Sequence, residues 1–175
     1  MADSPVRSLL LRLASELAKE RAVAERISDE VLEDACRMES SPDDPALERA
    51  HLAVVAVGLH RWYTAVEAIV ERVERALGTM PTGAEWHSEL LAGATLDITG
   101  VRPAILPEAC ADPLRSLLKF RHFFRHAYAV QLDGAKLRGL VADLRAVGQQ
   151  VHAALAAFEA FLRAAADDLN EPDSG

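Results

Sequence analysis

The sequence contains few cysteines, few aromatic residues, and no hydrophobic run near its start that could cross a membrane. Cys36 and Cys110 are its only cysteines, and they stand far apart, which argues against a disulfide framework or a thiolate zinc site. The apolar residues 9–11 are followed at once by Arg12, so neither a signal peptide nor a membrane-spanning segment is predicted there. We therefore expect a cytoplasmic protein with no membrane partner.

Signals for β-strands are also nearly absent. Apolar residues instead recur every three or four positions through most of the chain, as in amphipathic helices. Ser4, Asp44 and Asp112 each precede a proline, a pair favoured at helix starts. They predict helices over about residues 5–38, 45–77 and 113–132.

Two further helices complete the prediction. Thr82 and Glu85 have the spacing of a capping box and predict a short helix around Trp86, while Asp133 is expected to cap the last helix. Four long helices and one short helix, joined by short loops, predict an all-α antiparallel bundle. Half of the chain is hydrophobic, which favours one folded domain over residues 1–169 with a disordered tail at 170–175.

Residues 113–132 contain no acidic residue, although the whole chain has a formal net charge of -8. Arg115, Lys119, Arg121 and Arg125 give this stretch a charge of +4 and leave -12 on the remainder. The acidic total argues against a general nucleic-acid coat protein. A positive region on an acidic body is, however, expected to attract an anion locally.

The polar side chains of this stretch share one side of a helix. At about 100° per residue, they fall within an arc of about 160°, and the phenylalanines lie opposite. We therefore predict that the phenylalanines anchor the helix in the bundle and that the polar side faces outward or into an interface. The polar residues are Arg121, His122, Arg125, His126 and Tyr128, and the phenylalanines are Phe120, Phe123 and Phe124.

These residue types favour phosphate chemistry. Arginine binds phosphate oxygens with a planar fork, and histidine exchanges protons near neutral pH. The cluster contains no serine, cysteine or carboxylate nucleophile, but RNA supplies its own in the 2′-hydroxyl. His126 could remove that proton while Arg121 stabilises the charge that develops on phosphorus.

Plainer interpretations stay open at this point. The cluster could be a solvated charged surface, and Tyr128 could be a packed tyrosine. His122 and His126 have the i, i+4 spacing of helical metal ligands, but no carboxylate or cysteine stands nearby to complete a metal site. The remaining aromatic and histidine side chains are expected to be core or surface residues, namely His51, His60, His87, His152, Trp62, Tyr63 and Trp86.

The spacing Arg121-x4-His126-x-Tyr128 resembles the signature of HepT-like toxins, which belong to the HEPN superfamily of helical ribonucleases. His122 occupies a position that is commonly polar in that superfamily. The order and spacing of other residues resemble one HepT-like subgroup over about residues 50–140. These are Trp62, Tyr63, Glu67, Pro81, Thr82, Gly83, Trp86, His87, Leu90, Leu91, Val101, Arg102, Pro103, Leu132 and Asp133.

The resemblance implies the toxin of a type II/VII-like toxin–antitoxin pair: a homodimeric endoribonuclease that uses no metal or cofactor. Arg121 and His126 inherit the catalytic roles. Tyr128 is implied to be adenylylated by an MntA-like nucleotidyltransferase antitoxin, in a hetero-oligomer with the toxin. His122, Arg125 and Lys119 are expected to bind substrate phosphate.

Two other functions remain as alternatives. The first is a non-catalytic HEPN-like dimer that binds a nucleotide or a partner protein. The second is a purely structural helical assembly protein.

Overall fold

The computed structural model describes residues 4–40, 44–126 and 132–169, and these residues form helices joined by short connections. The prediction of an all-α fold is confirmed, since the described residues contain no β-strand, only an isolated bridge between Ile98 and Arg102. In chain order the helices are α1 (Pro5–Glu39), α2 (Pro45–Leu77), α3 (Trp86–Ala94), the 3-10 helix η1 (Glu108–Cys110), α4 (Ala111–His126) and α5 (Gly134–Asp168).

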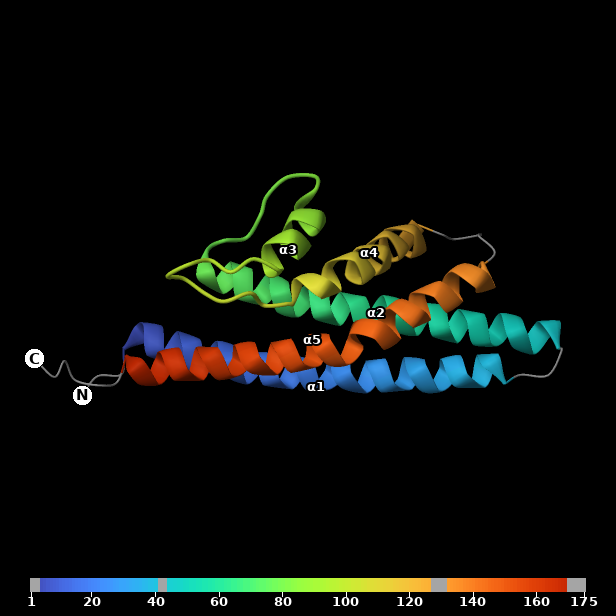
Figure 1. The fold of residues 1–175 in the computed structure, drawn as a ribbon, viewed down its shortest axis with the longest axis horizontal. Helices are drawn as coiled ribbons and strands as arrows, with labels where there is room; N and C mark the ends of the chain where they lie inside the picture. Colours follow the sequence, from blue (N-terminus) through green and yellow to red (C-terminus); the bar gives the residue numbers. More distant parts are fainter. Residues whose placement is uncertain (1–3, 41–43, 127–131, 170–175) are drawn as a thin grey trace, which may run out of the picture.

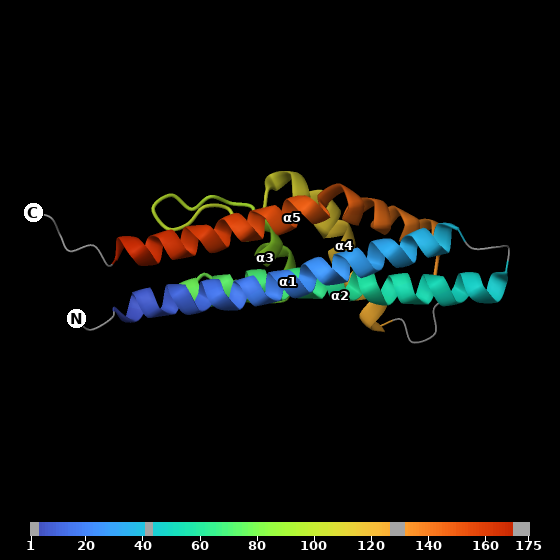
Figure 2. The same ribbon diagram turned by 90° about the horizontal axis from the view of Figure 1, so that it is seen from below.

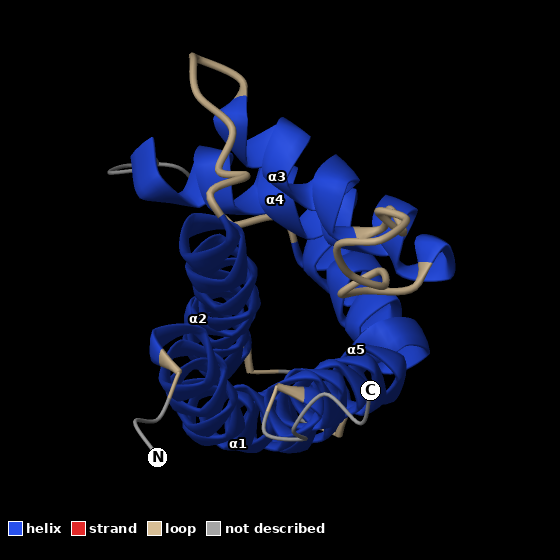
Figure 3. Cartoon of the chain, turned by 90° about the vertical axis from the view of Figure 1, so that its left-hand side faces the viewer, coloured by secondary structure: helices blue, strands red, loops and turns tan. Residues whose placement is uncertain are grey.

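Three long helices form the body of the molecule. α1 packs along both α2 and α5, and Figure 2 shows it lying across the two. The shorter α3 and α4 cover the opposite side, where α4 packs against both α2 and α5 (Figures 1 and 3). α4 has 16 residues, fewer than half of the 35 in α5. The segment that contains α3 and α4 therefore packs on a scaffold of three long helices.

Several of the predicted helix ends are confirmed. Asp44 Oδ1 accepts a hydrogen bond from the Ala46 amide at 2.8 Å, and Asp133 Oδ1 accepts one from the Ala135 amide at 2.9 Å. Each bond satisfies a backbone donor that has no partner inside its helix. Gly78 ends α2 with φ of 73°, a left-handed conformation that glycine adopts without strain.

Two predicted caps are wrong. Thr82 and Glu85 do not form a capping box: residues 83–85 form a bend and a turn, and α3 begins at Trp86 without a side-chain cap. Asp112 does not cap α4 either, because η1 leads directly into the helix and places Asp112 in its first turn. A backbone turn thus takes the place of a capping side chain at both starts.

The core is built from the apolar sides of the long helices. Trp62, Leu59 and Phe158 are almost completely buried, and each such side chain contributes roughly 1.5–3 kcal/mol by leaving water. The interpretation of Trp62 and Tyr63 as core aromatics is confirmed by their exposures of 0% and 3%. α2 supplies much of this core and contacts α1, α3, α4 and α5.

α2 is also long and apolar enough to cross a membrane, when judged by length and composition alone. Half of its most apolar window is buried inside the fold. Its buried side includes two carboxylates, Glu67 and Glu74. Contact with the other helices accounts for the apolar character of α2.

Glu74 forms a buried ion pair with Arg102, and both residues are 3% exposed. The Arg102 guanidinium also donates to the backbone carbonyls of Gly93 and Leu96 at 3.0 and 2.9 Å. Arg102 thereby ties the end of α3 and the loop that follows it to α2. Since removing one partner of a buried pair leaves an uncompensated charge, this contact holds α3 and the loop after it on the scaffold.

Replacing Arg102 with Met should lower the free energy of unfolding by about 3–5 kcal/mol, because Glu74 then stays buried without its cation. Urea denaturation followed by circular dichroism measures this. The control Arg12→Met breaks an exposed i, i+4 pair with Glu16 and should cost less than about 1 kcal/mol. Equal losses of unfolding free energy in the two variants would contradict a stabilising role for the buried Glu74–Arg102 pair.

Candidate functional site

Glu67 lies at the centre of the candidate site, on the buried side of α2. It follows Tyr63 by one turn and is 6% exposed. Its Oε2 forms an ion pair with Nη2 of Arg121 of α4 at 2.8 Å, and its Oε1 lies 2.8 Å from Nδ1 of His87 of α3. A buried carboxylate requires such partners, so Glu67 brings three helices together at one point.

Arg121 points inward, toward Glu67, and is 9% exposed. The expectation that the polar side of this helix faces outward or into an interface is therefore wrong for Arg121, whose guanidinium pairs with the buried carboxylate of α2. Nη2 pairs with Glu67. Nε and Nη1 are buried and have no hydrogen-bond partner within the described part of the chain. The guanidinium fork thus retains donors for an anion.

His87 joins the same network from the start of α3. Its ring stacks on Trp86 with centroids 3.6 Å apart, and it meets the His122 ring edge-to-face at 5.1 Å. His87 is therefore a largely buried histidine with a carboxylate partner. α3 thus places His87 beside Arg121 and His122 of α4.

His126 lies at the exposed end of α4, and its Nδ1 is 2.9 Å from the backbone oxygen of His122. A carbonyl oxygen only accepts, so Nδ1 must carry the proton in this contact. The lone pair of the neutral ring is then on Nε2. This is the nitrogen that a general base uses.

Three other side chains surround the Glu67–Arg121 pair. Burial, followed by the charges of Arg121 and Arg125, lowers the pKa of His60. Partial desolvation, followed by the nearby His87 and Arg121, lowers the pKa of His122. Both imidazoles therefore favour their neutral form in this positive environment.

Tyr63 is buried next to the same pair. Burial, followed by the negative charge of Glu67, raises the pKa of the Tyr63 phenol above its ordinary value. Tyr63 therefore stays protonated at neutral pH. It can donate a hydrogen bond in the site, but it cannot act as a base there.

Two of the three phenylalanines pack against the core as predicted, and the third does not. Phe120 and Phe124 pack against the core as expected, and Phe124 also contacts the His60 ring at 5.4 Å. Phe123 is 48% exposed, so its predicted anchoring role is wrong. It lines a groove between α4 and α5 together with Lys119 and Lys136.

The remaining predicted site residues lie as follows. His122 and Arg125 are exposed on α4 near Arg121, as a phosphate-binding role requires. Lys119 is exposed in the separate α4–α5 groove. Tyr128 lies outside the described residues.

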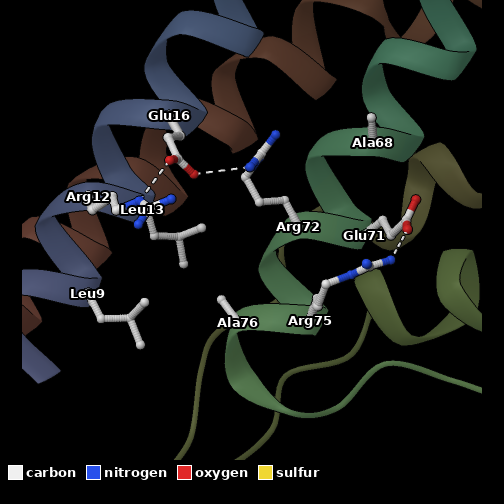
Figure 4. Close-up of a pocket in the computed structure, with 9 residues that line it drawn as sticks. All are labelled: Leu9, Arg12, Leu13, Glu16, Ala68, Glu71, Arg72, Arg75 and Ala76. Atoms are coloured by element: carbon white, nitrogen blue, oxygen red, sulfur yellow. Dashed lines mark hydrogen bonds and ion pairs between the residues drawn. The ribbon is translucent and has the colours of Figure 1, made fainter.

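The positive side chains of a second groove are already neutralised. Figure 4 shows a groove between α1 and α2 in which Arg12 and Arg72 both bind Glu16, at 2.9 and 3.0 Å. Arg75 in the same groove pairs with Glu71. This groove therefore offers an anion much less than the Arg121 site does.

Within the described ranges, no three His, Cys, Asp or Glu side chains are grouped as a metal site requires. Glu67 and His87 face each other, but the third nearby charge is the cation Arg121. This arrangement suits an anionic ligand better than a cation.

Sequence reasoning missed the roles of Glu67 and His87. One signal was available: Glu67 interrupts the apolar stripe of α2 at a position that faces the core. A carboxylate in such a position predicts a buried cation from elsewhere in the chain. The sequence could not show which cation, because His87 is 20 residues and Arg121 is 54 residues further on.

The sequence profile of the HepT-like protein family matches residues 54–162 of this chain. The match covers more than half of the 175 residues and contains α3, α4 and the entire Glu67 network. The chain therefore belongs to the HepT-like family of the HEPN superfamily, as its Arg121, His126 and Tyr128 spacing indicated. Searches of curated proteins and of solved structures each find no significant match.

The imidazoles of His60 and His122 should titrate below the ordinary value of 6.5 in NMR spectra. Because the folded state binds these protons less readily than the unfolded state, the associated stability is present above pH 6.5 and is lost as pH falls through the lowered values. Arg125→Gln should raise both midpoints by removing a nearby positive charge. Arg163→Gln, at a distant site, is the control. Titration midpoints of His60 and His122 above 6.5 would contradict the lowered pKa values.

Proposed function

We propose that this protein is an endoribonuclease toxin that cleaves RNA by attack of the 2′-hydroxyl on the adjacent phosphate. One observation carries the proposal: Arg121 pairs with Glu67 through Nη2, while its Nε and Nη1 have no hydrogen-bond partner among the described residues. A phosphate that reaches this guanidinium receives two donors that are already oriented. Orientation before binding is the main source of electrostatic catalysis.

His126 supplies the base in this proposal. Its Nε2 takes the proton from the 2′-hydroxyl while the 2′-oxygen attacks phosphorus. Arg121 stabilises the added negative charge on the phosphorane oxygens. The products are a 2′,3′-cyclic phosphate and a 5′-hydroxyl, and no residue of the protein becomes covalently attached.

His122 and Arg125 contribute contacts to the same phosphate or to its neighbour, since both are exposed beside Arg121. Lys119 contacts the RNA backbone further along, from the α4–α5 groove. These contacts add affinity that falls as salt rises.

RNA cleavage in the presence of EDTA tests the proposal. His126→Ala should lower the rate constant by about 10²- to 10⁴-fold. Arg121→Lys should lower it by about 10²- to 10³-fold, because lysine keeps the positive charge facing Glu67 but loses the fork. A 2′-deoxy nucleotide at the scissile position should abolish cutting there.

Arg26→Lys is the matched control, because Arg26 lies on α1 in an exposed pair with Glu30. Its rate should equal that of the wild type. Unchanged cleavage in both site variants would refute the mechanism. Binding of nucleotide or protein without cleavage would instead favour the non-catalytic HEPN-like dimer.

We further propose that an MntA-like nucleotidyltransferase antitoxin silences the protein by adenylylating Tyr128. The family resemblance and the charge of the site support this. An added adenylate brings a negative phosphate close to Arg121 and Arg125 along the chain, where it would compete with RNA. The active form is proposed to be a cytoplasmic homodimer that combines with the antitoxin into a larger complex.

Incubation with ATP and the cognate nucleotidyltransferase should add adenylate to the wild type but not to Tyr128→Phe. Intact mass spectrometry measures the addition. Tyr63→Phe is the control, because Tyr63 is the only other tyrosine and is 3% exposed. Labelling of Tyr128→Phe to the wild-type level would rule out this site.

A further inference from the structure

His87 is held in a defined position by three neighbours. Its Nδ1 is bonded to Glu67 Oε1 at 2.8 Å. Trp86 stacks on its ring with an interplanar angle of 28°, and the His122 ring meets it edge-on. Its side chain is 14% exposed, so it combines restraint with limited access to solvent.

The bond to Glu67 determines which nitrogen of His87 is free. An ionised carboxylate only accepts hydrogen bonds, so Nδ1 carries the proton that is shared with Glu67. Nε2 is then the nitrogen that can exchange a proton with a ligand. Histidines that work as acids or bases are commonly oriented by a carboxylate in this way.

His87 is also close to the group that is expected to hold phosphate. The two oxygens of Glu67 bind His87 and Arg121, each at 2.8 Å. The imidazole and the guanidinium are therefore separated by a single carboxylate. A phosphate bound by Arg121 would therefore lie near His87 and the adjoining His122.

The other nearby histidines are less suited to this role. His60 is half-buried against Phe124, and His122 is exposed. Of the histidines around Arg121, His87 alone has a hydrogen bond to a carboxylate within the described part of the chain.

The cleavage proposed above requires two proton transfers, and His126 accounts for only one of them. We propose that His87 is the general acid that protonates the leaving 5′-oxygen. This inference rests on the proposed ribonuclease function and adds a second catalytic residue, contributed by α3 of the same chain.

Two protons move and two bonds change in the proposed cleavage step. The 2′-hydroxyl proton passes to Nε2 of His126, and the 2′-oxygen forms a bond to phosphorus. The bond from phosphorus to the 5′-oxygen breaks, and its electron pair takes a proton from Nε2 of His87. Solvent then removes the proton from His126 and returns one to His87, so no other reactant is needed.

An RNA in which sulfur replaces the bridging 5′-oxygen tests this assignment, because a thiolate leaves without needing a proton. With ordinary RNA, His87→Gln should reduce the rate constant by about 10²- to 10⁴-fold. With the sulfur substrate it should cleave within about tenfold of the wild-type rate. His126→Gln should lose activity on both substrates, since the 2′-hydroxyl still requires a base.

His60→Gln is the matched control, as it removes another histidine near Arg121 and should leave both rates near the wild type. His87→Asn is a second variant that also keeps an amide donor for Glu67, and circular dichroism establishes that each variant is folded. The wild-type pH–rate profile should lose its descending limb with the sulfur substrate.

Equal losses of His87→Gln on the two substrates would overturn the acid role and leave His87 a structural residue. Unchanged cleavage of ordinary RNA by this variant would also overturn it. If the wild type cleaves neither substrate, the ribonuclease proposal itself is refuted. The general-acid role of His87 is then refuted as well.

Discussion

The buried carboxylate of Glu67 is the constraint on which the candidate site depends. A carboxylate removed from water costs several kcal/mol unless cations or hydrogen-bond donors surround it. Glu67 meets this requirement with Arg121 from α4 and His87 from α3. Both helices must therefore pack on α2 in the one register that brings these side chains to the same point. The identity of a single residue on α2 thus determines how two later segments of the chain are placed.

α2 carries a second buried carboxylate, Glu74, seven residues after Glu67 and on the same side of the helix. The two pairs differ in how fully each arginine is used. Arg102 binds Glu74 and also donates to the carbonyls of Gly93, Leu96 and Pro103. Arg121 binds Glu67 alone and keeps two buried nitrogens unpartnered within the described chain. A guanidinium whose donors are largely occupied holds the fold together, whereas one with donors left over is available to a ligand.

The helices were largely predictable because their signals are local. Apolar periodicity, Asp44, Asp133 and Gly78 each act within one or two turns, and all of them appear in the structure as expected. The prediction for the site was correct about family and spacing but wrong about the direction of Arg121. A helical projection shows which side chains share a side, but not which side faces a neighbouring helix. That depends on the partner, and Glu67 lies 54 positions earlier in the chain.

The counter-charge of the acid-free stretch, residues 113–132, lies on the core side of that stretch. Glu67 is 6% exposed and lies on the core side of Arg121, whereas His122, Arg125 and His126 lie on the solvent side. An anion that approaches from solvent meets the donors first and the carboxylate last. Because Coulomb energy falls with distance, the nearer positive groups dominate what this anion experiences. A glutamate in this position can orient an arginine and a histidine without repelling the phosphate that they are proposed to bind.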